Sequence, residues 1–236
     1  VILDCFTVYG TQVFAPFSSY RVSWGSVAVV DPLYTIPLLL SLVITGFIIR
    51  TKKTRRIVNY LGLALSTLYL VFTVYNKGRV QKIFENEFKA QNIEVTRMMT
   101  SPTIFNNILW SCTAEANDAY YVGLYSFYDT VPVKFSKIEK QHTLIQNIDS
   151  DHTITSLRWF SDNYFCIEKV DGKLFFNDLR FGAYFDKDGN NTDYIFSFLL
   201  EEEEGKYEMV ETIIGPPKDQ EEEYIDNFFA RIWGVH

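Results

Sequence analysis

The chain has 236 residues and a mass of 27.5 kDa, enough for one large domain or two modest ones. Its apolar fraction of 47% and aromatic fraction of 17% exclude a mainly disordered chain. Charge is unevenly divided: residues 1–78 carry seven basic and two acidic residues, and the remainder carries 15 basic and 27 acidic residues. This division indicates two physically different regions, and the acidic balance argues against nucleic acid as a partner.

An acidic residue interrupts the first apolar stretch, "VILDCF", and small polar residues follow it closely. The acid is Asp4, and Thr7, Gly10, Thr11 and Gln12 come next. A carboxylate in apolar sequence beside a membrane is costly unless it is paired, hydrated or bound to a cation. Asp4 is therefore either a metal ligand or catalytic acid–base, or an interfacial or capping acid that contacts water. Threonine hydroxyls at such spacing commonly bond the backbone instead.

Two uncharged runs, residues 32–49 and 57–75, predict a pair of membrane helices. Each can cross a hydrocarbon core of about 30 Å. Between them, "RTKKTRR" places five basic residues in seven, which predicts a cytoplasmic turn by the positive-inside rule. Asp31 followed by Pro32 is typical of a helix N-cap. Two buried helices of a soluble bundle are the alternative.

The sequence changes character after residue 79. Apolar residues at helical spacing in "RVQKIFENEFKAQNI" predict a short amphipathic helix. Short runs rich in Tyr, Phe, Val and Ile then alternate with turn residues over residues 100–215 and predict strands. "VDGK" and "DKDGNNTD" are typical of hairpin turns, and the second is a poor calcium loop because its Gly is misplaced.

Two helices are expected in the second half. Residues 150–160 begin as a helix, and the segment after the prolines at 216–217 ends the chain with a helix that places Tyr224, Phe228 and Ile232 on one face. The predicted fold class is α+β, a transmembrane helical hairpin followed by a strand-rich soluble domain with a C-terminal helix. The predicted division is a membrane-edge segment (1–30), two transmembrane helices (31–76) and the soluble domain (77–236).

Other polar residues have simpler structural explanations. His142 and His152 stand in polar sequence and are expected to be exposed rather than metal-ligating. Asp178 and Arg180 share one face of a strand and are expected to form a structural ion pair rather than part of a pocket. The glutamate runs at 201–204 and 221–223 are expected to be solvated.

"LDCFTVYGTQVFAPF" followed by "VVDPLYTIPLLL" resembles the YdjM-like family of bacterial membrane-bound proteins described as metal-dependent hydrolases. That family typically reads His-x-x-x-Asp-x-x-Thr-x-x-Gly-Thr-x-x-x-x-Pro-Phe, then Asp-Pro at the start of a membrane helix. The matching positions are Asp4, Thr7, Gly10, Thr11, Pro16, Phe17, Asp31 and Pro32. The family's His would fall one place before Val1, so we expect the chain to lack an N-terminal part. "RMMTSPTIFNNILWSC" and "NDLRFG" extend the resemblance over most of the chain.

The resemblance implies a membrane-bound, metal-dependent hydrolase with its site at the membrane edge. Asp4 would ligate a divalent metal ion such as zinc, and Thr7, Thr11 and Gln12 would complete the catalytic site. The substrate, left open by the sequence, would be a lipid or another envelope molecule near the bilayer. The chain is predicted to be a multi-pass protein of the inner cell membrane. With the basic turn in the cytoplasm, Asp4 and the soluble domain after Tyr75 are predicted to lie on the extracytoplasmic side.

A second hypothesis is non-enzymatic. The membrane part would be an anchor in the lipid bilayer, the acidic strand-rich domain would bind a partner, and the region around Asp4 would be a structural polar knot between helices. The oligomeric state is open under both hypotheses.

Overall fold

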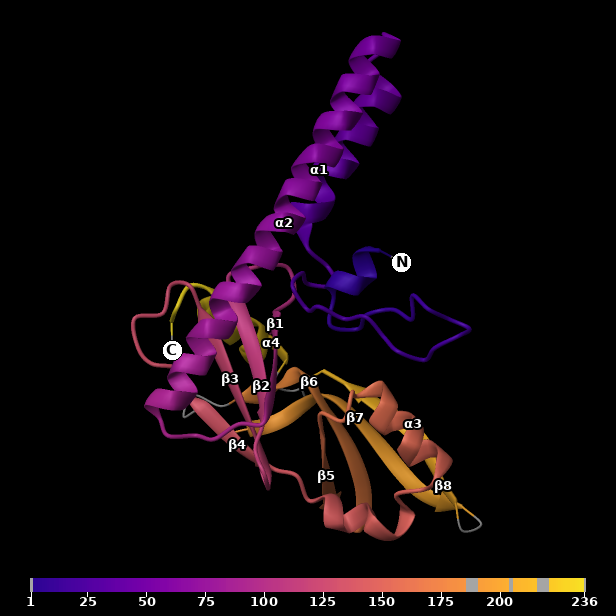
Figure 1. The fold of residues 1–236 in the computed structure, drawn as a ribbon, viewed down its shortest axis with the longest axis vertical. Coiled ribbons are helices and arrows are strands. Elements are labelled where there is room, and N and C mark those ends of the chain that lie inside the picture. The colour runs from indigo at the N-terminus through magenta and orange to yellow at the C-terminus, as the bar shows by residue number, and fades with distance from the viewer. Residues whose placement is uncertain (1, 186–190, 204–205, 216–220, 236) are drawn as a thin grey trace. The chain divides into compact units, whose positions relative to one another are not determined.

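The computed structural model (Figure 1) describes residues 2–185, 191–203, 206–215 and 221–235. It is an α+β structure with two four-stranded sheets and a helix near the C-terminus, which confirms the predicted α+β class and the C-terminal helix. The chain divides into two compact units: unit 1 is residues 1–83 with 100–110, and unit 2 is residues 84–99 with 111–236.

Helices dominate unit 1, and two of them lie side by side (Figure 1). The helical elements that begin in this unit are η1 (Leu3–Phe6), α1 (Pro32–Val43), the π-helical turn η2 (Ile44–Ile48) and α2 (Lys52–Ala90). The pair is antiparallel, because the Ser66 hydroxyl donates to the Tyr34 carbonyl oxygen at 2.8 Å, and Thr45 Oγ1 lies 3.1 Å from Asn59 Oδ1. Gly62 permits this approach, since a Cβ there would overlap the Ser41 side chain.

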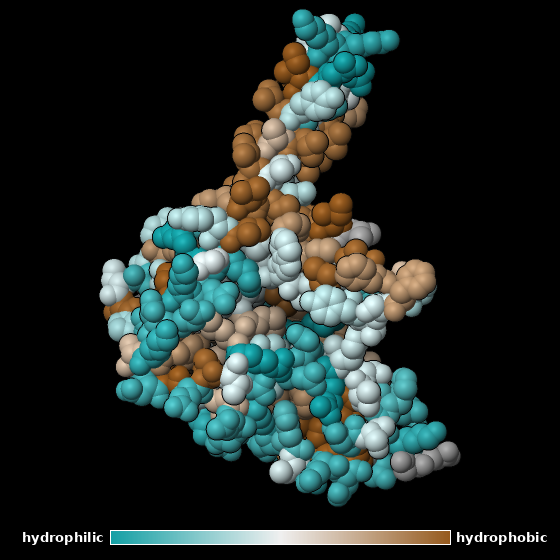
Figure 2. Space-filling view, in the orientation of Figure 1, coloured by the Kyte–Doolittle hydropathy of each residue, from teal (hydrophilic) through white to brown (hydrophobic). Residues whose placement is uncertain are grey.

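The surface of this helix pair is apolar along its length and hydrophilic at the basic turn (Figure 2). Among the described residues, α2 is the one helix long and apolar enough to cross a membrane, and the segment Pro32–Ile48 is apolar but shorter. The structure therefore contains a packed antiparallel pair. That both of its helices cross the membrane stays a prediction.

The helix predicted for residues 79–93 is not separate. α2 runs without interruption from the basic turn to Ala90, so the expectation that a membrane helix ends at Tyr75 and a second helix follows is wrong. No proline interrupts the segment, and Val80, Phe84 and Phe88 recur at helical spacing and are at most 1% exposed. Burial of that one stripe continues the helix beyond the apolar run.

The first sheet has the order β1-β2-β3-β4. Its strands are β1 (Arg97–Pro102), β2 (Leu109–Glu115), β3 (Ala119–Ser126) and β4 (Phe135–Glu139). β3 and β4 are antiparallel, with Ala119 opposite Glu139. Most of β2 is buried, which explains why its sequence, "LWSCTAE", is almost uncharged.

The second sheet is antiparallel and belongs to unit 2. Its strands, in sheet order, are β5 (Phe165–Val170), β6 (Lys173–Phe185), β7 (Asn191–Glu203) and β8 (Lys206–Ile214). Asp171 and Gly172, with φ of 50° and 81°, make the tight turn between β5 and β6, which confirms the hairpin predicted at "VDGK". The other predicted turn, "DKDGNNTD", spans residues 186–193, and its central part, residues 186–190, lies outside the described residues.

Helices cover one face of this second sheet. They are η3 (His142–Ile148) and α3 (His152–Phe160), the latter confirming the predicted helix near residues 150–160. Ile154 and Leu157 of α3 join Phe176, Phe198 and Leu200 of the sheet in one buried cluster. These contacts fix α3 over β6 and β7.

The C-terminal helix is α4 (Glu221–Ile232). Its predicted face is confirmed: Tyr224 and Phe228 are half-buried and Ile232 is buried. The guanidinium of Arg231 forms two hydrogen bonds, of 2.5 and 2.6 Å, with the carboxylate of Asp129. This bidentate pair holds the end of α4 against the first sheet.

Candidate functional site

The four residues predicted to form a catalytic site lie in and after η1. Asp4 is exposed on this short helix, and Thr7 is buried just beyond it. The Thr7 hydroxyl donates to the Asp4 carbonyl oxygen at 2.8 Å and accepts a 3.4 Å hydrogen bond from the Gly10 backbone N–H. Asp4 and Thr7 are thus brought together, through the backbone of Asp4 rather than its carboxylate.

Thr11 and Gln12 stabilise the base of the following loop. Thr11 and Val22 exchange two backbone hydrogen bonds, of 3.0 and 2.9 Å, and the Gln12 side chain donates to the Ser19 carbonyl oxygen at 3.3 Å. Gly10, with φ of +66°, has a stereochemical role, because a Cβ there would lie 2.5 Å from the Val22 carbonyl oxygen. The spacing Thr-x-x-Gly-Thr therefore has a local structural function.

A metal site at Asp4 would need further ligands. In the described part of the chain, no three His, Cys, Asp or Glu side chains are grouped so that they could hold a metal ion. The Thr7 hydroxyl and the Gln12 amide donate to backbone carbonyl oxygens, and Thr11 pairs with Val22 through its backbone. With Asp4 as the one carboxylate among them, these four residues do not by themselves fit a divalent metal ion. Asp4 as a ligand stays a prediction.

Unit 1 contains a polar cluster that the sequence did not predict, formed by the buried residues Ser26, Asn76, Thr100 and Asn107 and the half-buried Lys77. The Asn76 amide donates to Asn107 Oδ1 at 2.9 Å, and the Asn107 amide donates to the Ser26 carbonyl oxygen at 3.0 Å. Lys77 Nζ donates to the Thr100 carbonyl oxygen at 2.6 Å. The only available signal was the abrupt polarity of Asn76 and Lys77 directly after the apolar run.

Asp31 is the residue whose predicted role the structure reproduces most fully. Its carboxylate accepts hydrogen bonds from the backbone N–H groups of Leu33 at 3.0 Å and Tyr34 at 3.4 Å, as an N-cap does. The second carboxylate oxygen accepts a 2.8 Å hydrogen bond from the Tyr69 hydroxyl on α2. Asp31 therefore both caps α1 and joins α1 to α2.

Charged side chains in unit 2 are also paired. Asp178 and Arg180 form the expected ion pair, with side chains 0% and 1% exposed. Glu115 accepts hydrogen bonds from Arg97 and, at 2.7 Å, from Lys140. Burial raises the pKa of Glu115, but the two cationic donors outweigh it and leave the pKa below its usual range. These pairs are structural.

The two candidate histidines have different surroundings. His152 is exposed, as predicted. His142 is half-buried, so its predicted exposure is wrong: its ring stacks on Phe165, and Nε2 lies 2.9 Å from the Phe165 carbonyl oxygen. Burial lowers the pKa of His142 and favours its neutral form.

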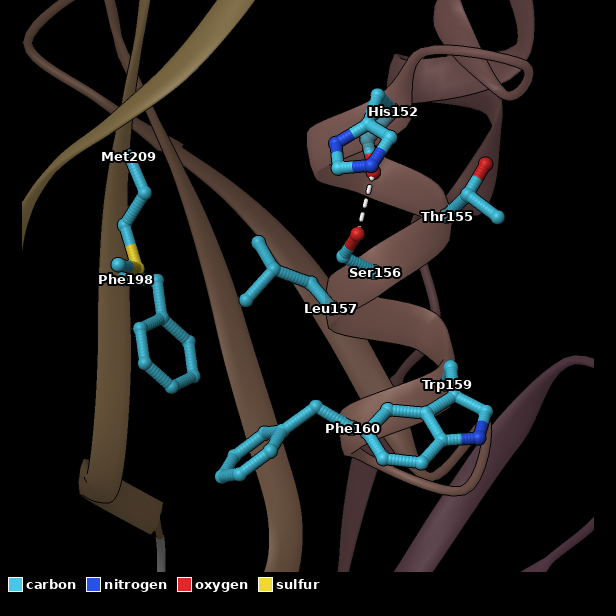
Figure 3. Close-up of a pocket in the computed structure, with 8 residues that line it drawn as sticks. All are labelled: His152, Thr155, Ser156, Leu157, Trp159, Phe160, Phe198 and Met209. Carbon is cyan, nitrogen blue, oxygen red and sulfur yellow. Dashed lines mark hydrogen bonds between the residues drawn. The ribbon is translucent and has the colours of Figure 1, made fainter. Parts of the chain in front are cut away.

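An apolar groove of about 660 Å³ lies between α3 and the strands β7 and β8, and we call it the α3–β8 groove. Its lining residues are His152, Thr155, Ser156, Leu157, Trp159, Phe160, Phe198 and Met209. Figure 3 shows Leu157 and Phe160 extending from α3 toward Phe198 and Met209 on the strands. Trp159 and Met209 are 46% and 48% exposed, so apolar surface is open to solvent here.

One acidic residue fixes α3 beside β8. The Asp151 carboxylate caps α3 by accepting from the Thr153 N–H at 2.8 Å, and it also accepts from the Tyr207 N–H at 3.2 Å. The hydrogen bond from Tyr207, together with the cap, lowers the pKa of Asp151. Sequence reasoning missed the groove because its two walls are about fifty residues apart in the chain.

Comparison with known proteins finds a similarity in the first third of the chain. Residues 1–80 match the model of the family described as YdjM inner membrane protein, and the match covers the Asp4 motif, α1, η2 and α2 as far as Val80. Among curated proteins and solved structures, none matches the chain. The first 80 residues are therefore similar to the YdjM inner membrane protein family.

Proposed function

We propose that this inner membrane protein is a membrane-anchored binding protein: the apolar helices hold it in the bilayer, and unit 2 binds a protein partner at the α3–β8 groove. The observation that carries the proposal is the groove itself, where Trp159 and Met209 leave apolar surface open beside a strand. Open apolar surface of this kind is characteristic of binding sites. In unit 1, Thr7, Thr11 and Gln12 each make a local backbone contact, which is compatible with a structural role for the Asp4 motif.

The proposal includes an orientation in the membrane. Five basic residues between positions 50 and 56 favour a cytoplasmic turn between α1 and α2, provided that both helices cross the bilayer. Unit 2 would then face the extracytoplasmic side, where its partner would be an envelope protein.

The proposal is tested in intact cells with a photo-reactive phenylalanine analogue placed at Trp159 or at Met209, and at exposed Glu139 on β4 as the control position. We expect the same discrete protein adduct from both groove positions and none from Glu139. In parallel, alkaline phosphatase fused to the C-terminus is expected to be active, and the same enzyme fused after Thr51 inactive. Absence of an adduct from both groove positions contradicts the binding function, and an inactive C-terminal fusion contradicts the orientation.

A second candidate function is the membrane-bound, metal-dependent hydrolase that the family resemblance implies. The specific observation in its favour is that the Asp4 side chain is exposed on η1, directly before a turn that requires Gly10. In this proposal Asp4 supplies one ligand to a divalent metal ion such as zinc, and Thr7, Thr11 and Gln12 keep the turn that presents it. The substrate would be a lipid or another envelope molecule. The described residues do not complete such a ligand set.

Metal content separates the two candidates. We expect a hydrolase, purified as the full-length protein in detergent, to retain about one equivalent of a divalent metal, and Asp4→Ala to retain at least about tenfold less, because loss of a ligand weakens a metal site strongly. Elemental mass spectrometry measures this, with Glu94→Ala as the control for removing an exposed carboxylate. Equal metal content in the wild type and Asp4→Ala contradicts the role of Asp4.

A further inference from the structure

The edge of the second sheet specifies the chemistry of a partner. We propose that β8 accepts an extended peptide segment in which apolar and basic residues alternate, added as a further strand along Glu208–Ile214. This inference rests on the proposed binding function and names the partner's chemistry. It follows from the exposed edge, from the apolar groove on one face of β8 and from acidic residues on the other.

β8 is the last strand of its sheet in the part of the chain that the structure describes. All its residues are exposed except Tyr207, which is half-buried. The N–H of Tyr207 donates to Asp151 and so points away from β7, and alternation along an antiparallel strand directs the N–H of Met209 the same way. An edge of this kind can pair with an added strand. Because Asp151 occupies the N–H of Tyr207, the added strand would pair with β8 from Glu208 onward.

One face of β8 continues the α3–β8 groove. Met209 lies opposite Leu200, and Thr212 lies opposite Phe198. Leu200 and Phe198 belong to the buried cluster under α3, so Met209 and Thr212 share that side of the sheet. The register shift leaves Val210 as an extra residue between Met209 and Glu211, and the two faces of β8 still alternate on either side of it. Every second residue of an added strand would fall on the groove face, where an apolar side chain would be buried next to Met209.

The other face of β8 is acidic. Glu208 lies directly opposite Glu201, and Glu211 lies opposite Leu199, on the side away from α3. Carboxylates directly opposite one another on paired strands repel. The intervening residues of an added strand would fall beside Glu208 and Glu211, and lysine or arginine there would relieve the repulsion. The two faces together therefore select an alternating apolar and basic segment.

The same charges disfavour a second copy of the chain as the occupant. Antiparallel pairing of β8 with β8, centred between Met209 and Val210, would place Glu208 of each copy beside Glu211 of the other. Like charges across a strand pair are destabilising, and charged residues on edge strands are a common protection against self-association. The carboxylates of Glu208 and Glu211 disfavour a second copy of the chain, and the same carboxylates attract a basic partner.

The probe is a fluorescein-labelled octapeptide of alternating lysine and valine, added to the full chain in phosphatidylcholine nanodiscs and followed by fluorescence anisotropy. Empty nanodiscs give the baseline. Three control peptides have four lysines followed by four valines, alternating glutamate and valine, or alternating lysine and N-methylated valine. We expect only the original probe to bind. The peptide of four lysines followed by four valines loses the alternation, the glutamate peptide has the wrong charge, and the N-methylated peptide loses backbone hydrogen-bond donors. The affinity of the original probe should fall as salt rises, because salt screens its attraction to the glutamates.

Variants of the chain test each face separately. Glu208→Lys combined with Glu211→Lys, and Met209→Ser alone, are each expected to weaken binding by about tenfold or more. Glu94→Lys combined with Glu139→Lys makes the same charge change at exposed positions away from the sheet edge and is expected to leave binding within about twofold. All four positions changed to lysine are exposed, so circular dichroism should show an unchanged fold.

The proposal is overturned if the peptide of four lysines followed by four valines, or the N-methylated peptide, binds as well as the original probe. It is also overturned if the original probe binds the Glu208→Lys, Glu211→Lys variant as well as it binds the wild type. A chain dimer that Met209→Ser dissociates, in a protein that ignores the probe, assigns the edge to a second copy and also overturns it. Photo-adducts at Trp159 and Met209 without probe binding would reject this partner chemistry and keep the binding function. If neither photo-adducts nor probe binding is observed, the partner chemistry and the binding function are both rejected.

Discussion

Asp178→Ala is expected to lower the free energy of unfolding of unit 2 by about 4 kcal/mol, since removing one member of a buried ion pair leaves the other charge buried and unpaired. Asp178 Oδ2 accepts a 2.6 Å hydrogen bond from Arg180 Nη2, and Arg180 Nε lies 3.1 Å from both carboxylate oxygens. The Arg180 side chain is 1% exposed, and its Nη1 already has no hydrogen-bond partner in the described structure. The guanidinium could not replace the lost carboxylate with water.

Two controls separate burial from the ion pair itself. Asp149→Ala removes the partner of Arg158 in a pair whose side chains are 54% and 37% exposed, and it is expected to cost no more than about 0.5 kcal/mol. Asp178→Leu combined with Arg180→Met removes both buried charges and is expected to cost less than Asp178→Ala. Denaturant unfolding of the full-length protein in detergent, followed by circular dichroism, measures all three. A cost for Asp178→Ala as small as that for Asp149→Ala would contradict the argument.

The local parts of the fold could be predicted from the sequence. Asp31 before Pro32 predicts a helix start because capping involves only the next three residues, and Asp171-Gly172 predicts a turn because positive φ is a local requirement. The spacing of Tyr224, Phe228 and Ile232 predicts the buried face of α4 for the same reason. Each of these patterns is complete within about one turn of chain.

The contacts that position the candidate sites are not local. Asn107 reaches Ser26 and Asn76, which are 81 and 31 residues away, and neither amide carries a sequence pattern that identifies its partner. The α3–β8 groove depends on the register that places Met209 opposite Leu200, next to an irregularity at Leu199. Strand register and sheet order follow from packing across the whole unit, so the groove could not be predicted from the sequence.

The Asp4 motif shows how a family pattern and a physical pattern can differ in meaning. The spacing of Thr7, Gly10 and Thr11 carries the resemblance to the YdjM family, yet the described contacts of Thr7 and Thr11 are with backbone atoms of the same segment. A motif preserved for a tight turn and one preserved for a metal site have the same appearance in the sequence. Only the metal content of the Asp4→Ala variant distinguishes the two for this chain.

Asp31→Ala is expected to destabilise the helix pair of unit 1 by about 3 kcal/mol, because it removes an N-cap and leaves a Tyr69 hydroxyl without its partner. Asp31 is 3% exposed, so its carboxylate is held almost entirely by the two backbone N–H groups and by Tyr69. Unfolding in mixed micelles of dodecyl sulfate and a mild detergent, followed by circular dichroism, measures the loss.

Two milder variants divide this effect between the cap and the interhelix bond. Tyr69→Phe keeps the cap and removes only the hydroxyl, so it is expected to cost about 1 kcal/mol. Asp31→Asn keeps a capping oxygen of comparable quality but loses the charged acceptor for Tyr69, and it is expected to fall between Tyr69→Phe and Asp31→Ala. In a Tyr69→Phe background, Asp31→Asn should then cost less than it does in the wild type, since the bond it weakens is already gone. Additive costs would show that Asp31 and Tyr69 act independently and would contradict the stabilising role assigned to the hydrogen bond between them.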